Sequence, residues 1–225
     1  MPTATSKLSR TDLLSAGFVA LSFLVALALY ARLPDRVATH WNGRGVADGF
    51  LPKPWGALIL PLVMASVWLL LWLIPRVSPR GYGLERSHRA YAIVQAAIMA
   101  FLFVVTVMAL LAATGAPVSI ARVIPAAVGA LFMVLGNFLP KFTRNFFVGV
   151  RTPWTLASDE VWLRTHRLAG ALFVAAGLLI VSSSLIGAGM IAILPAVGAV
   201  ALAPVIYSFV IYRRIEGTDR SARQP

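Results

Sequence analysis

The sequence has no cysteine, and only 12% of its 225 residues are charged, with eight acidic residues and three histidines. The absence of cysteine excludes a disulfide framework and any metal site built on thiolates. The scarcity of charge, together with a hydrophobic fraction of 59% and a mean hydropathy of +0.82, excludes a soluble globular domain. The class that fits is that of integral membrane proteins, which place long apolar runs in lipid.

The charges that are present are mostly basic and give a formal net charge of +12. Such an excess can indicate nucleic acid binding, but here the basic residues flank apolar runs and form no continuous basic stripe. This arrangement is typical of loops that orient membrane helices. We therefore expect the lipid bilayer as a partner and no direct binding of nucleic acid.

Six apolar runs are long enough to cross a hydrocarbon core of roughly 30 Å. They cover residues 13–33, 56–74, 91–113, 122–139, 159–186 and 190–212. The first run is open to a second interpretation as a signal peptide, because Ala26 and Ala28 form an A-x-A pattern, but signal-peptide cores have only about 7–15 residues. We expect a retained helix, and an all-α integral membrane protein with six transmembrane helices.

Lysine and arginine are unequally divided between the two sides of the expected membrane. With the N-terminus inside, the inner segments carry 15 of the 20 basic residues and the outer segments carry five. Because cytoplasmic loops are enriched in Lys and Arg, this bias predicts that both termini are cytoplasmic. The loop 32–55 then lies outside the cell, and the loop 141–165 lies inside. The spans themselves offer hydroxyl side chains and Gln95 but almost nothing ionisable, which disfavours a proton-coupled pump.

The outer loop 32–55 is rich in proline and glycine, which disfavour regular secondary structure. His40, Asn42, Gly45 and Asp48 place an imidazole, an amide and a carboxylate in this setting. One interpretation is a recognition surface for an extracytoplasmic ligand or toxin, with a metal held by His40 and Asp48 as a further option. The other is an ordered turn whose side chains bind its own backbone. Two ligands make a poor metal site, so we expect no metal.

The segment 136–170 is the densest polar stretch of the chain and is too long to be a simple connection between two spans. Candidate functional residues concentrate here, namely Asn137, Lys141, Asn145, Arg151, Thr152, Pro153, Trp154, Glu160, Trp162, His166 and Arg167. Its arginines could bind an anionic lipid headgroup or an acidic partner protein. The alternative, which we favour for Lys141 and Arg144, is that the cations only orient the protein in the membrane.

Arg151 differs from the other cations because Pro153 restricts the backbone of Thr152 directly after it. We expect a fixed backbone at Arg151 and a guanidinium that is available to an acceptor. The acceptor could be Asp159 or Glu160 at the start of the next helix, a lipid phosphate, or a carboxylate of a partner protein.

A helix is expected to begin after Ser158, whose hydroxyl can cap the free backbone N–H groups of the first turn. Glu160 and Arg164 are spaced i, i+4 and can pair on one helix face, and Trp162 and His166 have the same spacing, so their rings can stack. None of the zinc-helix or nucleophile-elbow spacings is present. We therefore predict no catalytic residue and no cofactor, and interpret His166 as a packed or hydrogen-bonding histidine.

Two motifs resemble a known family. The first motif lies within residues 136–170 and resembles the signature of the SdpI family of bacterial membrane proteins. It consists of GN-x-LPK, then N-x-x-x-G-x-RTPWTL, then EVW-x-x-THRLAG. LPDRVATHWNGRGVADGF, at residues 33–50, resembles a small domain often found ahead of the SdpI region. The resemblance implies a two-span domain at 1–88, a four-span SdpI-like region at 89–212 and a cytoplasmic tail at 213–225, which we expect to be disordered.

Members of the SdpI family are described as immunity and signalling proteins against a secreted peptide toxin. The resemblance implies a bacterial inner-membrane protein that gives immunity to, or senses, a membrane-active peptide or envelope stress. Its partners would be a peptide toxin outside the cell and a cytoplasmic regulator protein inside. The alternative, from the basic central segment, is a membrane enzyme or lipid-handling transporter that acts on an anionic headgroup or an amphipathic substrate.

Overall fold

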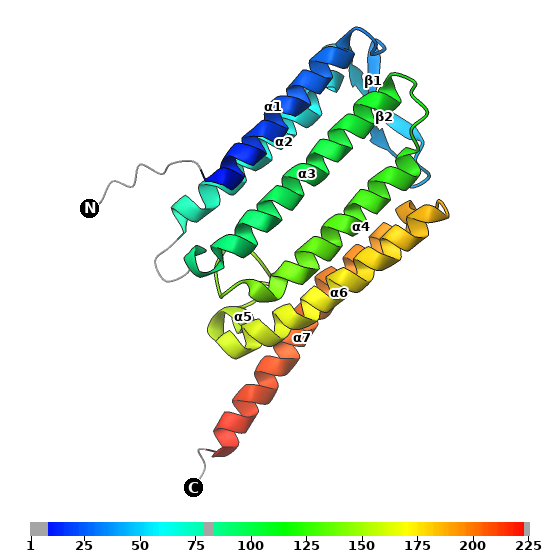
Figure 1. Ribbon diagram of the computed structural model, residues 1–225. Helices are drawn as coiled ribbons and strands as arrows, with labels where there is room; N and C mark the ends of the chain where they lie inside the picture. The colour runs from blue at the N-terminus through cyan, green and yellow to red at the C-terminus, as the bar shows by residue number, and fades with distance from the viewer. Residues whose placement is uncertain (1–8, 79–82, 223–225) are drawn as a thin grey trace, which may run out of the picture. The chain divides into compact units, whose positions relative to one another are not determined.

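The computed structural model describes residues 9–78 and 83–222, with side chains described up to residue 215. Within these residues, six helices are long and apolar enough to cross a membrane, which confirms the predicted all-α fold with six transmembrane helices (Figure 1). They are α1 (Arg10–Tyr30), α2 (Lys53–Val77), α3 (His88–Ala113), α4 (Ile120–Phe138), α6 (Asp159–Leu185) and α7 (Gly189–Ala222). Lys7, Arg80 and Arg223, which count toward the charge bias, lie outside the described residues.

The chain divides into two compact units. Unit 1 consists of Met1–Leu73 and Ala92–Ile120, and unit 2 consists of Ile74–Tyr91 and Ala121–Pro225. Unit 1 therefore holds α1, most of α2 and most of α3, whereas unit 2 holds the central segment and the last three spans. The domain boundary expected near residue 88 was drawn from sequence motifs and stays a prediction.

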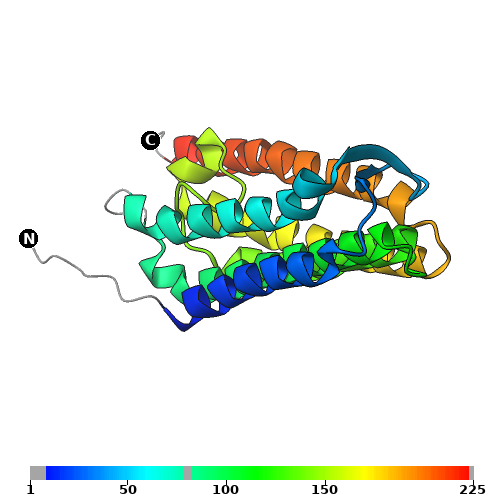
Figure 2. The same ribbon diagram turned by 90° about the horizontal axis from the view of Figure 1, so that it is seen from above.

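In unit 1, an antiparallel hairpin connects α1 to α2 (Figures 1 and 2). Its strands are β1 (Arg36–Trp41) and β2 (Ala47–Pro52). The expectation that residues 32–55 lack regular structure is therefore wrong. Proline occurs only at or beyond the strand ends, where its missing N–H costs the ladder little. The β-branched and aromatic residues of the RVATHW run favour the strand between them.

The hairpin is fixed to α2 by close packing at Gly56. A Cβ atom at Gly56 would clash with the side chain of Val37, which is 1% exposed. Val37 belongs to a core cluster with Ala26, Leu33, Ala57 and Leu110, so the first three spans and β1 share one apolar core. The base of the hairpin is thus a packed part of unit 1.

A buried carboxylate lies at the start of α1. Asp12 and Ser9 form a capping box, in which each side chain accepts a backbone N–H of the other residue. The amide of Gln95 on α3 donates to Asp12 Oδ1 at 3.2 Å and to Ser15 Oγ at 3.3 Å. Asp12 is only 7% exposed. It is therefore a buried ionisable residue that was not predicted from the sequence, where only Gln95 and hydroxyl side chains were named within the spans.

In unit 2, α4 and α6 approach so closely that their backbones touch at two glycine pairs. A Cβ at Gly136 would lie 2.6 Å from the carbonyl oxygen of Gly170, and a Cβ at Gly129 would lie 2.6 Å from that of Gly177. Gly129 and Gly136 are seven residues apart on α4, and Gly170 and Gly177 are seven residues apart on α6, so each helix has its two glycines on one face. Small residues allow this proximity in membranes.

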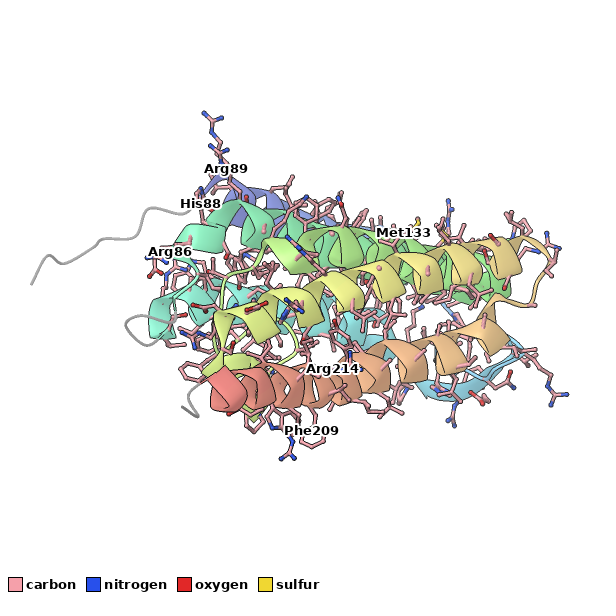
Figure 3. All side chains as sticks on the ribbon, turned by 90° about the horizontal axis from the view of Figure 1, so that it is seen from below. Arg86, His88, Arg89, Met133, Phe209 and Arg214 are labelled. Atoms are coloured by element: carbon pink, nitrogen blue, oxygen red, sulfur yellow. The ribbon has the colours of Figure 1, made fainter. Side chains whose placement is uncertain are left out.

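The helices α6 and α7 run antiparallel and are joined by a short turn at Gly187, whose φ is +79° (Figure 1). Their core contains Ala176, Ile180, Ala196 and Val200. The helix α7 continues through Ala222, so the expected disorder beyond residue 213 is wrong for residues 214–222. Figure 3 shows the start of α3 in unit 2, where His88 and Arg89 are the first two residues of the helix and Arg86 precedes them.

Candidate functional site

The four residues predicted for the outer loop have two different roles. Asn42 and Gly45 build the turn of the hairpin. The carbonyl of Asn42 accepts the N–H of Gly45 at 2.8 Å, and its side-chain oxygen accepts the N–H groups of Arg44 and Val46 at 2.9 and 3.2 Å. Gly45 has a φ of +73°, a conformation that favours glycine. These two positions therefore fit the turn interpretation.

His40 and Asp48 instead face each other across the two strands. The distance between His40 Nδ1 and Asp48 Oδ1 is 2.5 Å, and the side chains are 71% and 43% exposed. Among the described residues, no cluster of three or more histidine, aspartate or glutamate side chains adds a third ligand to this pair. The pair is an exposed hydrogen-bonding group available to a ligand.

The central loop, residues 142–152, folds around the side chain of Asn145. Its amide nitrogen donates to the carbonyls of Thr143 at 2.8 Å and Val148 at 3.2 Å. Its oxygen accepts the backbone N–H groups of Phe147 at 2.9 Å and Val148 at 2.7 Å. Asn145 is fully buried, and its side chain supplies four backbone hydrogen bonds to a loop that has no secondary structure.

His166 on α6 holds the far end of the central loop. Its Nε2 accepts the N–H of Val150 at 3.0 Å, so its Nδ1 carries the proton and donates to the carbonyl of Trp162 at 2.8 Å. The ring stacks on Trp162 with centroids 4.0 Å apart, as the sequence spacing predicted. Gly149, with a φ of +111°, leaves the space that the ring fills. His166 is fully buried and both its nitrogens are engaged, so it is a packed, hydrogen-bonding histidine as predicted.

Two further contacts attach the start of the central loop to its neighbours. The indole N–H of Trp162 donates to the carbonyl of Phe142 at 2.7 Å. The backbone N–H of Thr143 donates at 2.9 Å to the hydroxyl of Ser87, the last residue of the short helix η1 (Glu85–Ser87). Both Trp162 and Ser87 are buried. The central loop is therefore anchored to α6 and to the loop that precedes α3.

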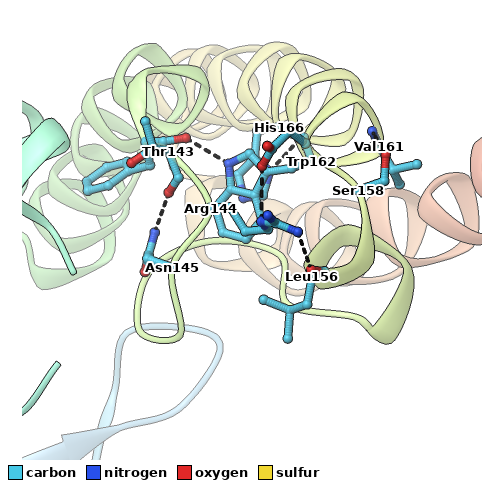
Figure 4. Close-up of polar contacts among 10 residues, drawn as sticks. Thr143, Arg144, Asn145, Leu156, Ser158, Val161, Trp162 and His166 are labelled. Atoms are coloured by element: carbon cyan, nitrogen blue, oxygen red, sulfur yellow. Dashed lines mark hydrogen bonds and ion pairs between the residues drawn. The ribbon is translucent and has the colours of Figure 1, made fainter. Parts of the chain in front are cut away.

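The arginine that binds the start of α6 is Arg144 and not Arg151. Arg144 Nε lies 3.0 Å from Asp159 Oδ1, and its Nη1 donates to the carbonyl of Leu156 at 2.7 Å (Figure 4). Arg151 donates to the carbonyl of Phe146. Of the three kinds of acceptor considered for Arg151, the carboxylates of Asp159 and Glu160 are paired with other arginines, Arg144 and Arg164. Arg144 therefore has a structural role beyond orienting the protein in the membrane.

The helix α5 (Pro153–Ala157) follows Arg151 and is capped by Thr152. The Thr152 hydroxyl accepts the N–H of Thr155, and the Thr155 hydroxyl accepts the N–H of Thr152 at 2.9 Å. Thr152 also lies 3.0 Å from the Ser208 hydroxyl on α7, and Trp154 packs on Phe209 with ring centroids 5.0 Å apart. The TPWT run therefore joins the central loop to α7.

The remaining candidates lie on the surface. Ser158 caps α6 and Glu160 pairs with Arg164, as predicted. Lys141, in the short helix η2 (Leu139–Lys141), lies over the ring of Phe138. Asn137 and Arg167 are exposed. These surface side chains do not lie together with Arg151. The predicted site residues therefore form several small clusters of contacts around the central loop and no single site.

A cavity of about 600 Å³ lies beneath the central loop. Its walls are formed by the loop and by α6 and α7, and the lining residues are Leu139, Phe146, Gly149, Val150, Arg151, Thr152, Leu156, Phe173, Val200, Ala201 and Val205. Among these described residues, Arg151 is the only charged one. Arg151, Ala201 and Val205 are exposed, so the cavity opens at the surface of unit 2.

Two segments of the chain match the models of known protein families. Residues 141–208 match the model of the SdpI/YfhL protein family, and residues 17–65 match a domain of unknown function (DUF1648). The chain is 28% identical over 212 residues to Immunity protein SdpI of Bacillus subtilis (strain 168). The aligned region covers 93% of this chain and 99% of that protein. The chain is therefore similar to the SdpI family in residues 141–208 and, over nearly its whole length, to an immunity protein that carries that name.

The match to the SdpI family model starts at the last residue of η2 and ends within α7. It includes the central loop, α5, α6 and most of the cavity lining. The six apolar helices and this similarity show that the protein is a multi-pass bacterial membrane protein. No solved structure gives a significant match to the chain.

Proposed function

We propose that this protein confers immunity to a membrane-active peptide toxin. The observation that carries the proposal is the similarity, over nearly the whole length of both chains, to a protein named Immunity protein SdpI. The architecture supports it, because a protein with six membrane spans resides in the layer that such a peptide attacks. The similarity covers both units, so the proposal concerns the whole chain.

The outer hairpin is the proposed recognition surface. The excess of basic residues in the loops assigned to the inner side supports an extracytoplasmic hairpin and cytoplasmic termini. His40 and Asp48 then present a donor and an acceptor to the outside on a rigid two-stranded base. A peptide could form hydrogen bonds to this pair and to the exposed Phe50 beside it.

Sensing of the toxin and recruitment of a cytoplasmic regulator form the second part of the proposal. A polar hollow of about 330 Å³ in unit 2, lined by Gly83, Glu85, Arg86, Thr143, Arg144 and Asp159, supports it. This hollow offers charges of both signs that a soluble protein could match. If a regulator docks there, Arg86→Glu should abolish toxin-dependent recovery of that regulator with the membrane fraction. Recovery unaffected by Arg86→Glu would exclude this hollow as the docking surface.

The experiment that tests immunity is heterologous expression in a sensitive bacterium that is challenged with membrane-active peptides. We expect survival at peptide concentrations that kill cells with an empty vector. A matched control is a chain with Gly136 and Gly170 changed to leucine, which cannot keep the contact between α4 and α6. Equal killing of wild-type and vector cells across a panel of such peptides would refute the proposal.

The orientation can be measured separately because the chain has no cysteine. Gly43→Cys lies in the exposed hairpin turn with no atom near its Cβ position, and Ala157→Cys lies at the exposed end of α5. In intact cells, a membrane-impermeant maleimide should label Gly43→Cys and should label Ala157→Cys only after permeabilisation. The reverse pattern would overturn the sidedness of every surface described above.

A further inference from the structure

We propose that unit 2 binds an anionic phospholipid, with the lipid phosphate on Arg151 and one acyl chain in the cavity beneath the central loop. This inference goes beyond toxin immunity and does not depend on it. It starts from the cavity of about 600 Å³, a size within the roughly 300–1,000 Å³ typical of small-molecule sites.

The wall of the cavity that η2, α6 and α7 form is apolar. Leu139, Phe173, Val200, Ala201 and Val205 supply only hydrocarbon side chains. Val205 is 41% exposed and belongs to a helix that is apolar enough to span a membrane, so we expect lipid on this side of α7. An acyl chain from the bilayer can enter such a cavity without removing any polar surface from water.

The rim of the cavity is polar and carries one positive charge. The two acids of segment 141–167 are already engaged, Asp159 with Arg144 and Glu160 with Arg164. Arg151 therefore has no carboxylate partner in this segment. Its guanidinium has five N–H donors, of which one donates to the carbonyl of Phe146. The others can form a fork around a phosphate.

The backbone around Arg151 is held from both sides, so the guanidinium is placed at the rim without further ordering. The N–H of Val150 donates to His166, and the carbonyl of Val150 accepts the hydroxyl of Thr155 at 2.8 Å. On the other side, Thr152 caps α5 and lies beside Ser208 on α7. A preformed site of this kind binds at a lower entropic cost than a mobile loop would.

A charged rim above an apolar wall favours an anionic phospholipid over a free anion or a neutral lipid. A free phosphate would use Arg151 and leave the apolar cavity unfilled. A zwitterionic lipid such as phosphatidylcholine would fill the cavity and offer a phosphate, but its choline cation would cancel the charge of that phosphate beside Arg151. Basic pockets between membrane helices at the cytoplasmic surface are known to bind acidic lipid headgroups.

The test is a lipid titration of the purified full-length protein in a neutral detergent, with bound lipid counted by native mass spectrometry. Phosphatidylglycerol and phosphatidylcholine with identical acyl chains serve as the two ligands, and inorganic phosphate is the competitor. Both phosphates can accept hydrogen bonds from Arg151, but the choline cation of phosphatidylcholine is repelled by it, so we expect phosphatidylglycerol to bind more tightly by roughly tenfold. Inorganic phosphate at millimolar concentration should not displace the lipid.

Three variants locate the site, and a fourth is the control. Arg151→Gln should remove the headgroup preference, and Arg151→Lys should keep the preference but bind both lipids more weakly, because lysine keeps the charge but lacks the fork. Val205→Phe at the mouth of the cavity should weaken both lipids. Arg213→Gln, which removes an exposed charge from α7 outside the cavity lining, should bind phosphatidylglycerol as the wild type does. Circular dichroism confirms that each variant is folded.

Equal binding of the two lipids by the wild type would overturn the proposal, as would an unchanged headgroup preference in folded Arg151→Gln. Displacement of the lipid by inorganic phosphate would assign the site to a free anion instead. Because lipid binding is counted on purified protein, these results are independent of any survival assay, and the proposal and toxin immunity can fail separately.

Discussion

Asn145→Ala is the substitution that should open the central loop. It removes four hydrogen bonds from a fully buried side chain, two accepted from Phe147 and Val148 and two donated to Thr143 and Val148. At roughly 1 kcal/mol for each bond, the loss would be about 4 kcal/mol. Water that reaches the opened loop restores some of these bonds, so we expect the free energy of loop opening to fall by about 3 kcal/mol.

The assay uses a single cysteine in a chain that naturally has none. Phe142 belongs to the central loop and is 3% exposed, so Phe142→Cys should react with a maleimide only when the central loop opens. A loss of about 3 kcal/mol predicts labelling that is roughly 100-fold faster in the Asn145→Ala background. Asn137→Ala is the matched control, because Asn137 is an exposed asparagine eight positions earlier in the chain. Labelling within twofold of the parent for Asn145→Ala would refute the role of this side chain.

Two further predictions concern the packing of unit 2. Gly177→Ala should lower the melting temperature of the purified protein because its Cβ would lie 2.5 Å from the carbonyl oxygen of Gly129, whereas Gly198→Ala, with no atom within 4 Å of its Cβ position, should be neutral or stabilising. Arg144→Ala should destabilise by about 1–2 kcal/mol more than Arg164→Ala, because it also removes the bond to the Leu156 carbonyl. Equal melting temperatures within either pair would contradict the corresponding contact.

Features that depend on local geometry could be predicted from the sequence. Hydrophobic run length alone located all six spans, because a bilayer requires a minimum length of apolar helix. The Ser158 cap, the Glu160–Arg164 pair and the stacking of Trp162 on His166 followed from helix spacing. Each of these contacts joins residues within one turn of a helix, so no knowledge of the tertiary path was needed.

Contacts between distant segments could not be predicted in the same way. Arg144 and Arg151 are both arginines in the same polar loop, and only the path of the loop around Asn145 decides which of them reaches Asp159. The path itself depends on Gly149 and His166, which meet across 17 residues of sequence. Asp12 was overlooked because its buried partner, Gln95, lies on another helix.

Two of the missed features left a signal in the sequence. The glycines of α4 and those of α6 each recur after seven residues, a spacing that puts them on one helix face. The hairpin was missed because its glycines and prolines were interpreted as breaking structure throughout the loop. The strand-forming run RVATHW on one side of Asn42-Gly43 indicated a hairpin.

The central claim is that the exposed His40–Asp48 pair on the outer hairpin carries protection against a peptide toxin. The most direct measurement is survival under peptide challenge, normalised to the amount of protein in the membrane, for His40→Ala, Asp48→Ala and Asn42→Ala. We predict that His40→Ala and Asp48→Ala lose protection at wild-type abundance, because their side chains are exposed, whereas Asn42→Ala loses abundance and protection together, because Asn42 builds the turn. Full protection by His40→Ala and Asp48→Ala at wild-type abundance would contradict the account.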